Sequence, residues 1–186
     1  MKIAEADILL VPGRSEPLPG HWQNRWCEKM ANAEWVTPSD WGTPSLPARL
    51  NQLHAAIMMA TRPVVLVAHS LGVFTAVHAA HRLADTKVRG AFLVAAPHLP
   101  ADLDELEADI RPFAAISTDP LPCPTMLVAS GSDPHCSLEE AASFAVQWGS
   151  DFHNAGDAGH IDTASGHGPW PEGLVMFTRL MQRLKA

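Results

Sequence analysis

The sequence predicts an α/β protein in which helices cover both faces of a doubly wound, mostly parallel sheet. Short apolar runs bounded by glycine and proline recur along the chain, and each is followed by a longer stretch with helical spacing. The run at 64–67, Val-Val-Leu-Val, is apolar without alternation, as expected of a strand that is buried on both faces. With 186 residues the chain can bury one well-formed core, so we expect a single domain over residues 1–186.

The strands are expected where apolar residues cluster between turn-forming residues. In chain order these runs are 8–11, the weaker 34–36, 64–68, 91–95 and 126–129, with a doubtful short strand near Phe152. Helices are expected in the stretches with helical spacing, at 21–32, 46–59, 71–83, 138–148 and 174–184. In the first helix, Trp22, Trp26 and Met30 recur at i, i+4 and i+8 and form one apolar stripe. The proline-rich and acidic stretch 97–124 predicts an excursion with one helical turn, because a strand resumes directly after it.

Composition and charge exclude several classes of protein. The chain is 47% hydrophobic and 18% charged with a mean hydropathy of 0.00, which is typical of a globular protein and not of a disordered chain or a coiled coil. Lysine and arginine number 13 against 20 for aspartate and glutamate, which gives a net charge of -7. Proteins that bind nucleic acids or anionic membranes carry the opposite charge, so we expect neither partner.

The cysteines and the first residues bear on the compartment. Cys27, Cys123 and Cys136 are too few and too scattered for a disulfide framework, and no Cys-x-x-Cys pair indicates structural zinc. Residues 1–7 carry acids where a signal peptide needs basic residues, and no apolar run approaches the roughly 20 residues of a membrane helix. The sequence therefore predicts a cytoplasmic protein.

Ser70 stands between a buried strand and an apolar helix, in the sequence Ala68-His69-Ser70-Leu71-Gly72. This context is typical of a nucleophile elbow, a sharp turn that needs small residues two positions before and two positions after the serine. Ala68 and Gly72 occupy these positions, where the usual pattern has two glycines. The alternative interpretation is a serine that only caps a core helix.

A serine becomes an effective nucleophile when a histidine held by a carboxylate takes its proton. In the order serine, acid, histidine, the acid follows a late strand and the histidine lies near the C-terminus. Asp133 follows the run 126–129, and His160 lies in a Gly-His-Ile string. We therefore expect Asp133 and His160 to complete a triad with Ser70, and His153 and His167 are the nearest alternatives for the base.

The remaining acids and histidines have simpler interpretations. Asp157 and Asp162 flank His160 and are expected to shape its loop. Without a His-Glu-x-x-His motif or a comparable cluster, no metal site is expected. His69 precedes the expected nucleophile and is expected to pack or to form a hydrogen bond. The histidines within expected helices are expected to be surface or satisfied residues: His54, His78 and His81.

An oxyanion hole needs two backbone N–H donors near the serine. Leu71 begins the helix after Ser70, where backbone N–H groups lack helical partners. Arg14 lies in the loop Val-Pro-Gly-Arg-Ser that follows the first expected strand. We expect the backbone N–H groups of Arg14 and Leu71 to form the hole. The alternative is that the Pro-Gly pair before Arg14 only forms the turn that ends the strand.

With these pieces assembled, the chain resembles the YdeN-like family of small serine hydrolases, minimal α/β-hydrolases whose members include a vertebrate retinoblastoma-binding protein. The resemblance spans essentially the whole chain and implies a triad at Ser70, Asp133 and His160. It is carried by Val11-Pro12-Gly13, Gly20-His21-Trp22-Gln23 with Arg25-Trp26, Asp40-Trp41 with Pro44, residues 68–72, Ser132-Asp133-Pro134, Gly159-His160-Ile161 with Ser165-Gly166, and residues 168–173.

Two positions depart from the family pattern. Asp162 stands where the family often has asparagine. A second tryptophan often begins the helix after the first Trp-x-x-Pro string in the family, and here no tryptophan stands near Leu46. Both departures bear on the shape of the pocket and not on the expected triad. Trp22, Trp41 and Trp170 are candidates for the walls of an acyl or aromatic pocket, although large aromatic residues more often lie in the core.

These observations predict a serine hydrolase, carboxylesterase-like and without a cofactor, that cleaves small acyl esters through an acyl-enzyme. At 186 residues little chain is left for a lid, which favours an open site and small or flexible substrates. Thioesters and amides suit the same triad, and the sequence does not separate them. The alternative from another class is a protein-interaction module on a hydrolase fold. The sequence carries no signal for the oligomeric state.

Overall fold

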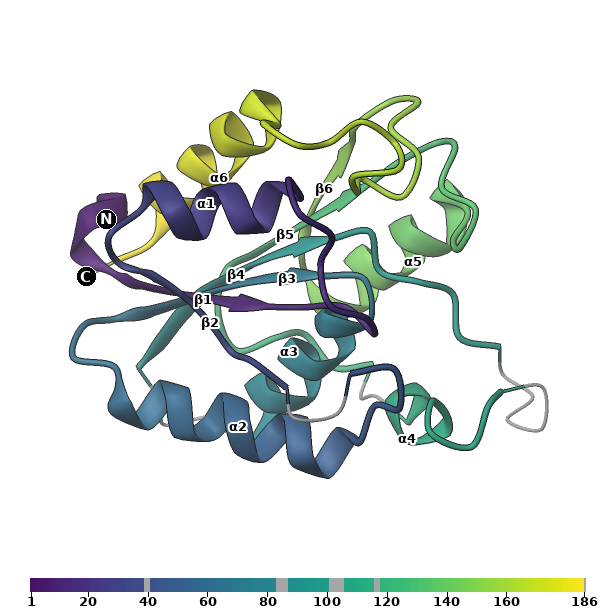
Figure 1. Ribbon diagram of the computed structural model, residues 1–186, viewed down its shortest axis with the longest axis horizontal. Coiled ribbons are helices and arrows are strands. Elements are labelled where there is room, and N and C mark those ends of the chain that lie inside the picture. The colour runs from purple at the N-terminus through teal and green to yellow at the C-terminus, as the bar shows by residue number, and fades with distance from the viewer. Residues whose placement is uncertain (39–40, 83–86, 101–105, 116–117, 186) are drawn as a thin grey trace.

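Six parallel strands form one sheet in the order β2-β1-β3-β4-β5-β6 (Figure 1). The computed structural model describes residues 1–38, 41–82, 87–100, 106–115 and 118–185, apart from the side chains of 81 and 82. The strands are β1 (Asp7–Val11), β2 (Ala33–Trp35), β3 (Val64–His69), β4 (Val88–Val94), β5 (Thr125–Ala129) and β6 (Asp151–Asn154). The chain starts at β1, moves outward to β2, and returns across β1 to β3. The predicted doubly wound parallel sheet is therefore confirmed.

The helices cover the two faces of the sheet (Figure 1). They are α1 (Trp22–Lys29), α2 (Leu46–Met59), α3 (Leu71–Arg82), the single turn α4 (Arg111–Ala114), α5 (Leu138–Trp148) and α6 (Pro171–Arg183), with a short 3-10 turn at Ile3–Glu5. Helices α1 and α6 pack on one face, while α2, α3 and α5 pack on the other. No lid covers the sheet in the part of the chain that the structure describes.

The core consists of two apolar layers separated by the sheet. In β1, Ile8 and Leu10 point into the layer under α1 and α6, whereas Leu9 and Val11 point into the layer under α2 and α3. Every residue of β3 is buried. This two-sided burial is the reason that the run at 64–67 shows no polar alternation.

Most element boundaries agree with the sequence, and the differences have local causes. Helix α1 ends at Lys29 because Met30 adopts an extended backbone, with φ -105° and ψ 108°. Helix α6 begins at Pro171, three residues before the expected start, because proline fits the first turn of a helix. The excursion after β4 contains the expected helical turn as α4. Part of its acidic stretch, 101–105, lies outside the described residues.

Candidate active site

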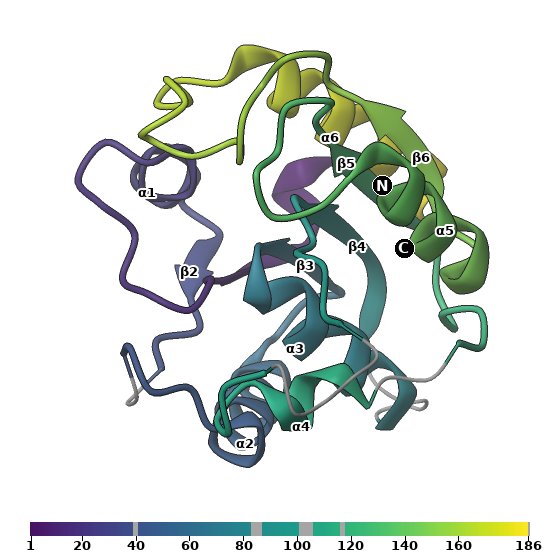
Figure 2. The ribbon, with the colours of Figure 1, turned by 90° about the vertical axis from the view of Figure 1, so that its right-hand side faces the viewer.

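The candidate site lies at the edge of the sheet where the carboxyl ends of the strands meet (Figure 2). Ser70 follows β3, Asp133 follows β5, and His160 follows β6. The strand order reverses between β1 and β3, and ligands of doubly wound sheets bind outside such a switch point. The fold therefore places three loops that are distant in sequence around one point.

Ser70 occupies a sharp turn between β3 and α3. Its φ of 54° lies in the left-handed region, which costs a non-glycine residue backbone strain. The turn is held because the Ser70 N–H donates to the Val94 carbonyl at 3.0 Å and the Val73 N–H donates to the Ser70 carbonyl at 2.9 Å. A β-carbon at Gly72 would lie 2.5 Å from the carbonyl oxygens of Val11 and Pro12, so only glycine lets α3 approach the end of β1 this closely.

A continuous hydrogen-bond chain joins the three residues expected as a triad. The His160 Nε2 atom lies 2.9 Å from the Ser70 hydroxyl oxygen. The His160 Nδ1 atom lies 3.0 Å from each carboxylate oxygen of Asp133. Because a carboxylate only accepts, Nδ1 carries the proton and Nε2 is free to accept the proton of the hydroxyl. The Asp133 side chain is only 2% exposed, which shields this contact from water.

The loops that carry Asp133 and His160 are joined by two serines at the end of β5. The Ser130 hydroxyl donates to the Gly156 carbonyl at 3.1 Å and accepts from the Ala158 N–H at 2.9 Å. The Ser132 hydroxyl accepts from the Gly159 N–H at 3.0 Å. These contacts fix the spacing between the acid and the histidine, and sequence reasoning gave no role to either serine.

Two further side chains hold the backbone of the His160 loop. The His69 Nε2–H donates to the His160 carbonyl at 2.9 Å. The Trp22 indole N–H donates to the Ile161 carbonyl at 2.9 Å. Ile161 is buried and has a φ of 48°, so the loop needs such support. The interpretation of His69 as a packed, hydrogen-bonded residue agrees with this contact.

The loop after β1 lies directly against the turn at Ser70. A β-carbon at Gly13 would lie 3.2 Å from the Ser70 β-carbon. Leu71 directly follows Ser70 in the chain, and Arg14 directly follows Gly13, so each of the two expected oxyanion donors is the chain neighbour of a residue at this contact. The guanidinium of Arg49, only 3% exposed, donates to the Gly13 carbonyl at 2.7 Å and to the Arg14 carbonyl at 3.1 Å. Sequence reasoning missed Arg49, because a lone arginine in a helix gives no motif.

Comparison with known proteins identifies the family. A family model described as serine hydrolase matches residues 8–179. The chain belongs to the serine hydrolase family. A search of curated proteins found no match.

Solved structures agree with this membership. This serine hydrolase is similar to a YdeN-like hydrolase from Pectobacterium atrosepticum, with 29% identity and a TM-score of 0.84 over 96% of this chain and 91% of that one. It is also similar to the ydeN gene product of B. subtilis, with 18% identity and a TM-score of 0.76 over 96% and 100%. The thioesterase RedJ from Streptomyces coelicolor shares the fold at 14% identity, with a TM-score of 0.66 over 97% and 86%. The YdeN-like resemblance predicted from the sequence is confirmed.

The three tryptophans considered for the pocket of this serine hydrolase occupy different environments. Trp22 is 0% exposed and Trp170 is 4% exposed, and both pack with Trp26 and Phe177 between the sheet and the helices α1 and α6. Trp22 has no exposed surface, and Trp170 lines a cavity that does not contain Ser70, so the expectation that Trp22 and Trp170 wall the substrate pocket is corrected. Trp41 is half-buried and lines a cavity next to the candidate site.

The cavity at Ser70 of this serine hydrolase has a volume of about 260 Å³. Its walls come from the loop after β1, the turn at Ser70 and the His160 loop. The lining residues are Gly13, Ser15, Glu16, Pro17, Leu18, His21, His69, Ser70, His160, Asp162, Thr163 and Ala164.

The alternative histidines lie elsewhere. His153, on β6, lines a different cavity with Trp170, and His167 lies within 3.3 Å of the Ser165 hydroxyl. The interpretation of Asp162 as loop-shaping fits its carboxylate, which accepts from the Ser165 N–H at 2.9 Å.

Among the described residues, no group of three or more histidine, cysteine or acidic side chains could hold a metal ion. No helix in the described part of the chain is long and apolar enough to span a membrane.

Two buried histidines of this serine hydrolase have pKa values well below the ordinary histidine value. Burial is the main cause that lowers the pKa of His21 to about 4 and that of His69 to about 3. Neighbouring histidines lower both values further, whereas Asp162 opposes the shift. The His21 Nδ1 atom also accepts from the Gln23 N–H at 3.2 Å, which requires an unprotonated ring nitrogen. Both side chains are therefore neutral in the folded protein at neutral pH.

We expect the free energy of unfolding to fall as the pH drops below about 6.5, the ordinary histidine pKa, because the unfolded chain then takes up protons that the folded protein excludes. The loss continues down to the folded pKa values and reaches up to about 1.4 kcal/mol per pH unit for each histidine. Urea unfolding at several pH values between 7 and about 5 measures it. His69→Gln should reduce the slope, and an equal slope in both proteins would contradict the assignment.

Proposed function

We propose that this serine hydrolase cleaves small acyl esters through an acyl-enzyme formed on Ser70. The observation that carries the proposal is the unbroken hydrogen-bond chain from the Ser70 hydroxyl through His160 to Asp133. A serine that only capped a helix would not need a histidine at 2.9 Å that is itself held by a carboxylate.

In the acylation step the Ser70 oxygen forms a bond to the acyl carbon while the His160 Nε2 atom takes the hydroxyl proton. The bond between the acyl carbon and the leaving-group oxygen then breaks, and His160 gives its proton to the departing alcohol. A water molecule then attacks the acyl carbon of the acyl-enzyme while His160 takes its proton. The bond to the Ser70 oxygen breaks, His160 returns the proton to Ser70, and the carboxylic acid is released. Asp133 orients the imidazole and stabilises its positive charge in both steps.

Negative charge develops on the acyl oxygen during both steps. The backbone N–H groups of Arg14 and Leu71 are the proposed donors, and each is worth roughly 10²–10³ in rate. The start of α3 adds a favourable field at the same place. Of the three tryptophans, Trp41 remains our candidate for contact with the substrate. Trp22 instead holds the backbone of the His160 loop in place.

Hydrolysis of p-nitrophenyl acetate and butyrate by the purified protein tests the proposal, with Ser70→Ala as the comparison. We expect turnover that disappears with Ser70→Ala. Parallel assays with the matching thioester and anilide distinguish ester from thioester and amide preference. A folded wild-type protein without turnover on any of these substrates would favour the protein-interaction module. The cytoplasmic location stays a prediction.

The buried Arg49 should affect the rate through the oxyanion loop. Arg49→Lys weakens the contacts that hold the Gly13 and Arg14 carbonyls together, because an ammonium cannot reproduce the fork of a guanidinium. We expect kcat for an acyl ester to fall roughly 10-fold or more with little change in KM, since the donors shift relative to Ser70.

Arg62→Lys is the matched control, because Arg62 binds Asp7 and the Ala4 carbonyl at the opposite edge of the sheet. This variant should lose stability without losing kcat. An unchanged kcat in Arg49→Lys, with the protein folded, would refute the role assigned to the guanidinium.

A further inference from the structure

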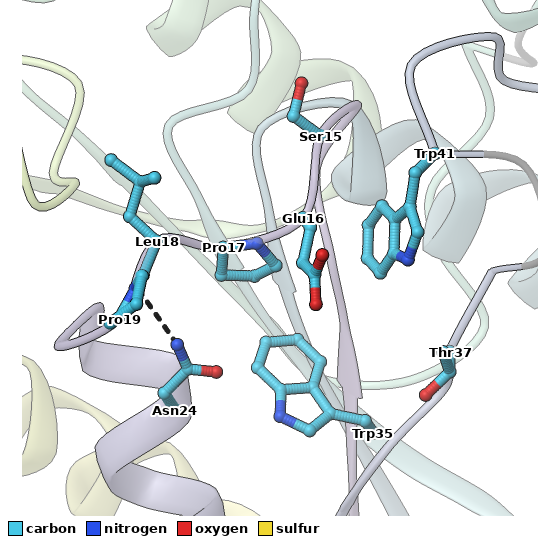
Figure 3. A pocket seen from close by; sticks show the side chains of 9 residues that line it. All are labelled: Ser15, Glu16, Pro17, Leu18, Pro19, Asn24, Trp35, Thr37 and Trp41. Carbon is cyan, nitrogen blue, oxygen red and sulfur yellow. Dashed lines mark hydrogen bonds between the residues drawn. The ribbon is translucent and has the colours of Figure 1, made fainter.

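We propose that a second cavity beside Ser70 recognises a cationic, ammonium-type group of the substrate; this inference rests on the proposed function and names the class of its substrate. The cavity has a volume of about 650 Å³ and lies between the loop after β1 and the loop after β2 (Figure 3). It is lined by Ser15, Glu16, Pro17, Leu18, Pro19, Asn24, Trp35, Thr37 and Trp41.

The second cavity adjoins the cavity that contains Ser70. The segment 15–18 lines both cavities and forms the boundary between them. The strand order β2-β1-β3 brings the loops after these strands to neighbouring positions on one edge. The loops after β1 and β2 are also joined by the Gly42 N–H, which donates to the Arg14 carbonyl at 3.4 Å. A substrate held at Ser70 can therefore extend across the segment 15–18 into the second cavity.

The side chains of the second cavity suit a cation. Trp35 and Trp41 stand on two sides of it, and the Glu16 carboxylate points into the space between their indole rings (Figure 3). Indole faces attract cations, and quaternary ammonium groups are bound by aromatic cages of this kind. The carboxylate adds a full negative charge at the same place, so rings and charge favour one type of ligand.

A neutral or anionic ligand fits this arrangement less well. An apolar group between the two rings would take the Glu16 carboxylate out of water without providing a partner, which is costly. An anion would be repelled by Glu16 and by Asp162, which lines the adjoining cavity. Among the described lining residues of both cavities there is no lysine or arginine. The net charge of -7 acts in the same direction at longer range.

The test compares pairs of esters that differ only in charge. One pair is butyrylcholine and its neutral isostere, in which carbon replaces the quaternary nitrogen. The other pair carries the same trimethylammonium group, or its carbon isostere, at the end of the acyl chain of a p-nitrophenyl ester. We expect the wild-type protein to favour the cationic member of at least one pair by roughly 3- to 30-fold in kcat/KM.

Three variants locate the effect. Glu16→Gln and Trp41→Leu should each reduce the preference to less than about one third of the wild-type value, since each removes one of the attractive groups. Glu28→Gln is the matched control, because Glu28 is an exposed residue near the end of α1 and its replacement changes the net charge equally. This control should keep the wild-type preference.

The outcomes separate this inference from the proposed function. If all four esters are hydrolysed and neither cationic member is favoured, the proposed function stands and the cation site is refuted. A preference that falls equally in Glu28→Gln would also refute it, because the effect would then come from net charge. If these four esters and p-nitrophenyl acetate and butyrate all stay intact, the proposed function fails. In that case, calorimetric titration of the protein with choline tests the cation site independently of hydrolysis. Binding to the wild-type protein that is lost in Trp41→Leu would support the cation site, and no binding would overturn it.

Discussion

Replacing His160 with alanine should lower kcat for an acyl ester by roughly 10²- to 10⁴-fold, the contribution of a positioned general base. Without the imidazole, the Ser70 hydroxyl has no acceptor for its proton and the leaving group has no donor. The effect should appear mainly in kcat, because His160 acts on the bonds that change and not on the rest of the substrate. Steady-state kinetics with p-nitrophenyl acetate measure it.

His153→Ala is the matched control for this prediction. His153 was an alternative for the base, and the structure places it on β6 in a cavity that does not contain Ser70. We expect this variant to keep kcat within a factor of about two, since a surface substitution away from the site has little effect. The reverse pattern, with activity lost in His153→Ala and kept in His160→Ala, would show that another histidine is the base.

Gly72→Ala should destabilise the protein by about 1–3 kcal/mol or more, because its β-carbon would meet two backbone oxygens at the end of β1 and the start of the loop after it. The carbonyls of Val11 and Pro12 lie 2.5 Å from that position, and backbone atoms cannot turn away as a side chain can. A glycine-to-alanine change within a helix ordinarily stabilises a protein by roughly 1 kcal/mol. A loss of stability would therefore show that the close contact outweighs the helix propensity. Urea unfolding gives the free-energy change.

Gly131→Ala provides the comparison for Gly72. A β-carbon at Gly131 would have the Leu138 Cδ1 atom as its nearest neighbour, at 3.4 Å, which is an ordinary contact with a movable side chain. We expect the stability of this variant to stay within about 1 kcal/mol of wild type. Equal stability losses in the two variants would mean that the close approach of α3 to β1 is not what requires glycine at position 72.

Much of the fold follows from patterns that are local in the sequence. The strands β1, β3 and β5 are short apolar runs buried on both faces, and helices α2 and α5 begin and end where their spacing predicts. The turn residues around Ser70 are local as well, since the elbow needs only small neighbours and a buried strand before it. Local chemistry is therefore sufficient to single out Ser70 as the candidate nucleophile.

The parts that were missed depend on contacts between distant segments. Arg49 lies 36 residues from Gly13 in the chain, and Ser132 lies 27 residues from Gly159. Neither contact follows from a periodic pattern, and the strings that contain Ser132 and Gly159 do not reveal that these two residues touch. Trp22 and Trp170 were misjudged for a related reason, because a large aromatic ring suits a pocket wall and a core equally well and only the tertiary packing decides.

Labelling with a fluorophosphonate tests the central claim, the activation of Ser70, most directly. Intact-mass analysis of the folded wild-type protein should show one adduct per chain, and Ser70→Ala should show none. Ser143→Ala, a change at an exposed serine on α5, should label like wild type. His160→Ala and Asp133→Ala should label much more slowly. A folded wild-type protein that stays unlabelled, or a label that persists in Ser70→Ala, would contradict the account.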